Sequence, residues 1–251
     1  MKTLLAINTL TSVQNQPYAS HLNLVYRMGK ESDDEILLYT GYRTGIDRFR
    51  NMAGQVALTQ ECDLLMFLDD DVAVPRDTYT KLRKHIDDGA DIVTPLIYIR
   101  GYPFEPMMFK SATIEGITGL FAYKDWEKEV SAEQPLLPCS AIGFSCCLMR
   151  TKLLSEVREP WFITGTNCTE DVYFCLKARN HYENKINILV DTAIRGGHLL
   201  DSEFIDFSTR PALQRFYEDL NPSLVAQAKM DRGEDYFRNN IAAIKEKYER
   251  A

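Results

Sequence analysis

The stretch that decides the fold is Leu64-Leu65-Met66-Phe67-Leu68-Asp69-Asp70-Asp71, in which five apolar residues run directly into three carboxylates. An apolar run of this length is typical of a strand that is covered on both faces. Adjacent carboxylates are costly to remove from water unless a cation neutralises them. Open α/β sheets bind ligands at the carboxyl ends of their strands, so the stretch predicts an acidic ligand site there. The alternative is a solvated acidic turn.

Strands and helices alternate on both sides of this stretch. Apolar runs predict strands at Thr3–Asn8 and Ile36–Thr40, and apolar residues at helical spacing predict helices at 18–28, 49–60 and 76–88. Strands joined by helices of this length form right-handed crossovers in a mainly parallel sheet, so the fold class is α/β. Further along, we expect strands at 91–94, 141–150 and 185–190, helices at 152–157, 169–179 and from about 208, and extended segments over 95–138.

The composition is that of a globular protein in one large domain. The 251 residues are 45% hydrophobic and 26% charged, with a formal net charge of −7. An acidic balance argues against broad electrostatic attachment to nucleic acid or to an anionic membrane. No stretch approaches the ~20 apolar residues of a membrane span, and the first apolar run stops at Asn8, too early for a secretory signal. We therefore expect a cytoplasmic protein, in a bacterium or a phage-infected host, with no membrane span.

The six cysteines indicate neither a disulfide framework nor a zinc site, because they are scattered and none forms a C-x-x-C pair. Cys146 and Cys147 are adjacent in an apolar run, where the alternation of a strand would point them to opposite faces. We expect free, buried thiols in a reducing compartment.

Thr169-Glu170-Asp171 opens a predicted helix. In a structural role, Thr169 caps the helix and both acids interact with its positive end. In a functional role, a carboxylate held at a helix start beside a cleft takes a proton from an attacking hydroxyl. Both interpretations stay open on these residues alone.

Two further motifs are candidates for ligand binding. In Gly196-Gly197-His198, the glycines let the backbone pass close to a ligand and the imidazole can bind a metal, although a lone His is more often structural. Arg43, Arg48 and Arg50 lie between the second and third predicted strands. Guanidinium groups suit phosphate recognition, and the alternative is a solvated helix face.

Taken in order, these motifs resemble the glycosyltransferase A-type (GT-A) fold, and most closely its large inverting group called family 2. The segments that carry the resemblance are Asp47–Ala57, Cys62–Asp71, Gly143–Arg150, Thr169–Arg179 and Gly197-His198. The resemblance implies a three-layer GT-A catalytic domain over residues 1–205, with a mainly parallel central sheet. Residues 206–251, which the resemblance does not cover, would form a C-terminal helical extension packed on the same domain.

The resemblance further implies an enzyme that moves one sugar from a nucleotide-diphosphate donor, with a UDP-sugar expected first, to an acceptor hydroxyl with inversion. Asp171 would be the base and Glu170 its acceptor-orienting neighbour. Asp69, Asp71 and His198 would bind the metal, Asp71 as the principal ligand. The donor would also contact Asp69 and Asp70, with Thr9 and Tyr39 at the nucleobase and Arg43 and Arg48 at the phosphates.

A mixed set of carboxylates and an imidazole accepts Mn²⁺ readily and Mg²⁺ plausibly. The Q-x-x-R-W signature of processive polysaccharide synthases is absent from the sequence, which favours a single addition by an enzyme without membrane helices. The acceptor stays open among a glycan, a lipid-linked sugar, a protein and a modified base in DNA. The sequence does not indicate an oligomeric state.

Three alternatives are weighed against this interpretation. A nucleotidyltransferase of related fold usually carries a Gly-rich loop with Lys or Arg after its first strand, and residues 9–17 contain none of these. A non-catalytic sugar-nucleotide-binding module would have lost the base, whereas Asp171 is present. A retaining GT-A glycosyltransferase is the alternative stereochemistry.

Overall fold

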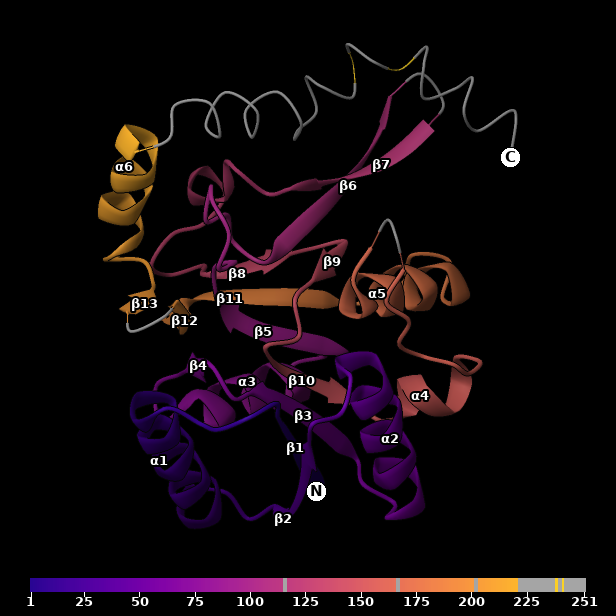
Figure 1. The fold of residues 1–251 in the computed structure, drawn as a ribbon. Coiled ribbons are helices and arrows are strands. Elements are labelled where there is room, and N and C mark those ends of the chain that lie inside the picture. The colour runs from indigo at the N-terminus through magenta and orange to yellow at the C-terminus, as the bar shows by residue number, and fades with distance from the viewer. Residues whose placement is uncertain (115–116, 166–167, 201–202, 221–237, 239–240, 242–251) are drawn as a thin grey trace.

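The structure is a computed structural model that describes residues 1–114, 117–165, 168–200, 203–220, 238 and 241 (Figure 1). Strands and helices alternate along the first hundred residues, as the apolar periodicity predicts. The elements in chain order are β1 (Lys2–Thr9), α1 (Asn15–Glu31), β2 (Glu35–Tyr42), α2 (Ile46–Thr59), β3 (Leu64–Asp69), β4 (Val72–Ala73), α3 (Thr78–Asp87), β5 (Ile92–Leu96), β6 (Met108–Ile114), β7 (Ile117–Ala122), the 3₁₀-helix η1 (Trp126–Lys128), β8 (Leu136–Pro138), β9 (Ala141–Ile142), β10 (Cys146–Arg150), α4 (Lys152–Glu156), α5 (Glu170–His181), β11 (Ile188–Arg195), β12 (Gly197–Leu200), β13 (Glu203–Ile205) and α6 (Arg210–Leu220).

A seven-stranded sheet with the order β2-β1-β3-β10-β5-β11-β8 forms the centre of the molecule. Strands β2, β1, β3, β5 and β11 run in one direction, and β10 and β8 run against them. The mainly parallel sheet is therefore confirmed. Since β10 and β8 are reversed, both begin at the edge of the sheet where β3 ends. The carboxyl ends of β1, β2 and β3 lie level, with Asn8 opposite both Gly41 and Asp69.

The sheet is covered on both faces, which gives three layers (Figure 1). One core packs α2, α4 and α5 against the sheet, around Phe67, Phe144 and Phe174. The other core packs α1 and α3 against the opposite face, around Leu24, Tyr79 and Leu82. Strand β3 contributes Leu65 and Phe67 to the first core and Leu64, Met66 and Leu68 to the second. The apolar run that opened the sequence analysis is thus a central strand buried on both faces.

Cys146 and Cys147 point to opposite faces of the sheet, as predicted, because they belong to different cores. All six cysteines are free, and each is buried except the partly exposed Cys168. Burial raises the pKa of the Cys139 thiol to about 12.

The segment between β5 and β10 contains extended pieces, as predicted, but one predicted strand is divided in two. Residues 95–138 were expected as extended pieces, and β6 and β7 form a hairpin that projects from the body of the molecule (Figure 1). The run 141–150 was expected as one strand of the central sheet. It is divided into β9, which pairs with β6, and β10, which enters the central sheet. Residues 143–145 connect the two strands at the edge where β3 ends.

The end of the described chain contains a small sheet and a helix. Strand β12 pairs with β4 and β13, which sets His198 opposite Val72, directly after the three aspartates. The predicted C-terminal extension is helical at α6, and residues 221–251 lie outside the described residues apart from positions 238 and 241. The proposed boundary near residue 205 stays a prediction.

Candidate active site

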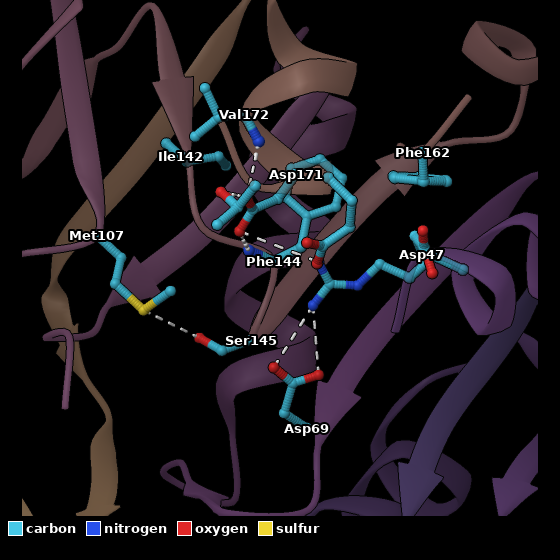
Figure 2. A network of polar contacts seen from close by, with 12 residues as sticks. Asp47, Asp69, Met107, Ile142, Phe144, Ser145, Phe162, Asp171 and Val172 are labelled. Atoms are coloured by element: carbon cyan, nitrogen blue, oxygen red, sulfur yellow. Dashed lines mark hydrogen bonds and ion pairs between the residues drawn. The ribbon is translucent and has the colours of Figure 1, made fainter. Parts of the chain in front are cut away.

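A buried arginine connects the acidic end of β3 with the start of α5. Arg50 of α2 is only 2% exposed. Its Nη2 lies 3.3 Å from Oδ1 of Asp69, and its Nη1 donates to Oε1 of Glu170 and lies 4.0 Å from Oδ2 of Asp171. Figure 2 shows Asp69 and Asp171 on different sides of this network. Two sequence motifs 100 residues apart therefore share one guanidinium.

The surroundings of Arg50 hold the guanidinium in place. Its carbon lies 5.5 Å from the ring centre of Phe67 and 5.7 Å from that of Phe144, which allows cation–π attraction to both. Burial opposes its charge, but Asp69, Asp171 and Glu170 outweigh that effect and raise the pKa of Arg50. Burial likewise raises the pKa of Glu170 and of Asp69, against the charge of Arg50. The cation and the carboxylates thus depend on one another for charge compensation.

Helix α5 begins at Glu170, and its first turn fixes the Asp171 carboxylate. Oδ1 of Asp171 accepts hydrogen bonds from the Thr169 hydroxyl and from the Val172 amide, the latter at 2.7 Å. Oδ2 accepts the Phe144 amide at 3.2 Å (Figure 2). In the structural interpretation of this motif, Thr169 would cap the helix through its side chain. Its hydroxyl instead binds Asp171, whose own carboxylate accepts the Val172 amide.

The three aspartates at the end of β3 have different partners. Oδ2 of Asp70 accepts the Leu10 amide at 3.1 Å, which places this side chain toward β1. Asp71 faces the other way, with Oδ1 3.4 Å from Nε2 of His198 and Oδ2 2.8 Å from Nη1 of Arg100. Burial would raise the pKa of Asp71, but the hydrogen bond and charge of His198 and the charge of Arg100 outweigh it and lower that pKa.

His198 is placed by its pairing with β4 and by one hydrogen bond. Its Nδ1 lies 2.8 Å from the carbonyl oxygen of Tyr98. A carbonyl only accepts, so Nδ1 carries a proton, and Nε2 is the ring nitrogen that faces Asp71. A histidine that binds a metal usually donates its other N–H to such an acceptor.

These donors fit a hard divalent cation in part. The described residues contain no group of three or more His, Cys, Asp or Glu side chains close enough to hold a metal ion. Asp71 and His198 nevertheless offer one oxygen and one nitrogen ligand, and Asp69 is engaged by Arg50. Phosphate oxygens and water complete the coordination of Mg²⁺ or Mn²⁺ in many nucleotide sites. Asp71 and His198 would therefore hold the cation together with a diphosphate.

The residues predicted at the donor lie at the neighbouring strand ends. Thr9 ends β1, and its carbonyl accepts the Arg43 amide at 3.0 Å. Tyr39 of β2 stacks on Phe49 of α2, with ring centres 5.6 Å apart. Arg43 and Arg48 are both exposed, and Arg43 lies over the ring of Tyr42. No contact of these residues with the acidic cluster is described, so their donor roles stay predictions.

Two residues of the site were not assigned to it from sequence. Arg50 was considered only as one of three phosphate-binding arginines. A signal for its burial exists, because Arg50, Ala53, Gly54 and Ala57 follow the i, i+3, i+4, i+7 spacing of a buried helix face. Arg100 has no such signal, since its approach to Asp71 depends on how the loop after β5 folds.

Comparisons with known proteins agree with this architecture. The family model described as glycosyl transferase family 2 matches residues 28–158, just over half of the chain. No curated protein matches the chain in sequence. The described residues contain no helix that is long and apolar enough to cross a membrane.

Among solved structures, A197 from STIV is similar at a TM-score of 0.52 and 22% identity, over 80% of this chain and 87% of that chain. A putative glucose-1-phosphate thymidylyltransferase from Bacillus anthracis gives a TM-score of 0.46 and 10% identity, over 85% and 95% of the two chains. Residues 1–349 of S. aureus TarS give 0.41 and 17%, over 81% and 59%. The likeness to A197 supports the fold.

Proposed function

The chain belongs to glycosyl transferase family 2 and is a glycosyltransferase that uses a nucleotide-sugar donor, and we propose that it transfers one sugar with inversion in a metal-dependent reaction. The observation that carries the proposal is the convergence of Asp69, Asp71, Glu170, Asp171 and His198 around Arg50 and the end of β3. A UDP-sugar with Mn²⁺ is the first donor to test.

The charge of the site supports a metal requirement. Five carboxylates, those of the three aspartates at the end of β3 and of Glu170 and Asp171, lie at this site, and among the described residues the guanidiniums paired with them are those of Arg50 and Arg100. Such a site repels the diphosphate of a donor unless a cation accompanies it. A bound divalent cation would supply positive charge where the leaving diphosphate gathers negative charge.

Asp171 is the candidate base. Its Oδ1 is occupied by two hydrogen bonds, which orient the carboxylate, whereas Oδ2 accepts one, from the Phe144 amide, and lies 4.0 Å from Nη1 of Arg50. Oδ2 therefore has the lone pair with which to accept the proton of an attacking hydroxyl. Glu170 is bound to Arg50 and compensates its charge, so we assign it to orienting the site.

The test is the Asp171→Asn variant with donor binding and turnover measured separately. We expect turnover to fall by about 10²–10⁴-fold, because a general base is lost, while calorimetric binding of the donor in Mn²⁺ stays nearly unchanged. Asp47→Asn is the matched control, since Asp47 is also an acid in the first turn of a helix and should keep full turnover. Wild-type turnover in Asp171→Asn would reassign the base.

Two further measurements examine the rest of the proposal. NMR of the first-formed product distinguishes inversion from retention at the anomeric carbon. Titration of UDP-, GDP- and CDP-sugars with and without Mn²⁺ examines the metal, and Asp71→Asn should abolish the effect of Mn²⁺ on binding. Metal-independent binding, or a preference for a free nucleoside triphosphate, would contradict the proposal.

A further inference from the structure

Arg100 is a cation of the site that the proposed reaction has not yet used. It lies on the loop after β5, with Nη1 2.8 Å from Oδ2 of Asp71. The other oxygen of Asp71 faces Nε2 of His198 at 3.4 Å. Arg100 thus occupies the same carboxylate through which the proposed cation would bind.

The loop that carries Arg100 is fixed at its base while the arginine side chain is exposed. Ile99 donates its amide to Glu105 at 2.9 Å, and Phe104 donates to Gly101 at 2.8 Å. The side chain of Arg100 is 54% exposed, against 23% for that of Asp71. Arg100 therefore has room to change rotamer without movement of the loop backbone.

A divalent cation and the Arg100 guanidinium cannot both occupy Asp71 fully, because each needs the same oxygens and the two charges repel. An ion pair with one exposed partner contributes little free energy, so displacement of the guanidinium is inexpensive. A displaced guanidinium beside a diphosphate finds oxygens that its planar fork can bind in a bidentate manner.

We propose that Arg100 is a donor-binding residue that holds Asp71 in the empty site and transfers to the donor diphosphate when the divalent cation takes its place at Asp71. The inference rests on the proposed metal-dependent function. It predicts opposite effects of one substitution: removal of Arg100 favours the metal alone and disfavours the metal with the nucleotide.

The first experiment measures Mn²⁺ binding alone, from the EPR signal of free Mn²⁺. Arg100→Gln should bind Mn²⁺ about two- to fivefold more tightly than wild type, because a competing exposed ion pair is removed. Arg100→Lys keeps a charge and should lie between them. Arg158→Gln, at another exposed arginine, should match wild type, and Asp71→Asn should lose Mn²⁺ binding.

The second experiment measures the affinity of the protein for UDP, GDP and CDP in saturating Mn²⁺. Arg100→Gln should bind the preferred nucleotide at least several-fold more weakly, with Arg158→Gln unchanged. Unchanged affinity of Arg100→Gln for Mn²⁺ or for the nucleotide would overturn the role of Arg100. If Asp71→Asn lost Mn²⁺ binding in the same experiments, the proposed function would still be supported. Absence of Mn²⁺ binding in wild type would overturn both.

Discussion

At the scale of single residues, Arg50 has the largest structural consequence. A guanidinium removed from water needs its charge compensated, and here Asp69, Glu170 and Asp171 come from both halves of the chain to compensate it. The two acidic motifs are therefore held in a fixed relation before any ligand binds. Preorganised charge of this kind costs no rearrangement when the reaction takes place.

The first prediction concerns Arg50→Met. It keeps much of the side-chain volume but leaves buried carboxylates without their cation, so we expect the free energy of unfolding to fall by about 3–5 kcal/mol. Urea denaturation measures the change. The control is Arg48→Met on the same helix, where the exposed side chain should give a change within about 0.5 kcal/mol. Adding Glu170→Gln to Arg50→Met should recover part of the lost free energy of unfolding. Equal stability of Arg50→Met and wild type would show that the carboxylates do not depend on Arg50 for charge compensation.

The second prediction concerns Asp34, before β2. Its carboxylate accepts hydrogen bonds from Tyr79 at 2.6 Å, from Arg83 at 3.0 Å and from the amino group of Met1 at 2.8 Å. Burial would raise its pKa, but these partners outweigh burial and lower it. A lowered pKa means that the stabilisation is complete above the unfolded pKa, near 4, and is lost as the pH falls through the folded pKa.

Asp34→Asn should therefore lower the free energy of unfolding by about 2 kcal/mol at pH 7, because hydrogen bonds to a charged group are lost. The difference from wild type should shrink as urea denaturation is repeated below pH 4. Asp33→Asn is the exposed neighbouring control. A difference that stayed constant from pH 7 to pH 3 would show that the charge of Asp34 is not the cause.

At the scale of elements, two helical glycines separate intrinsic propensity from packing. Gly29 of α1 has no atom within 4 Å of the position that a Cβ would take. Gly54 of α2 would place a Cβ 2.9 Å from the Trp161 ring, in the core beneath α4. Helix propensity favours alanine equally at both positions, so any difference between the two substitutions comes from packing.

Gly29→Ala should raise the free energy of unfolding by about 0.5–1 kcal/mol, through helix propensity alone. Gly54→Ala should lower it by about 1–2 kcal/mol, because overpacking against Trp161 outweighs the same gain. Thermal or urea denaturation of the two variants measures both signs. Stabilisation by Gly54→Ala would mean that Trp161 moves aside at no cost.

At the scale of the whole molecule, the cysteines report on both cores together. Cys146 and Cys147 lie on opposite faces of the sheet, and Cys62, Cys139 and Cys175 are buried elsewhere. Burial raises the pKa of each of these thiols, so few thiolates form in the folded state.

Iodoacetamide at pH 8 should therefore modify Cys168 first in the folded protein, and all six cysteines after denaturation. Mass spectrometry of peptides from a time course assigns the order. Rapid modification of Cys146 or Cys147 under native conditions would indicate that the sheet is open to solvent. Equal rates at all six positions would contradict the three-layer packing.

Much of the fold was predictable, because it depends on local signals. The apolar run before Asp69 and the helical spacing around Phe49 each identify an element without reference to the rest of the chain. The direction of β10 was not predictable in this way, since an apolar run does not state which way the strand enters the sheet. The division at 143–145 likewise depends on pairing between β9 and a hairpin that is distant in sequence.

The candidate site was predictable in its motifs and not in its contacts. Asp69, Asp171 and His198 were chosen from order and residue type, and the structure brings them to one edge of the sheet. Their functional roles stay predictions. The contacts of Arg50 and Arg100 could not be predicted, because each joins residues that only the folded chain brings together.

The two reversed strands have a consequence for how such an enzyme could diversify. Because β8 begins at the rim where β5 stops, the segment between β5 and β8, which contains the β6–β7 hairpin, leaves and re-enters the sheet at one rim. Exchange of this segment would change that rim while β3 and α5, which carry Asp69 and Asp171, stayed in place. The fold therefore allows this segment to vary without a new scaffold.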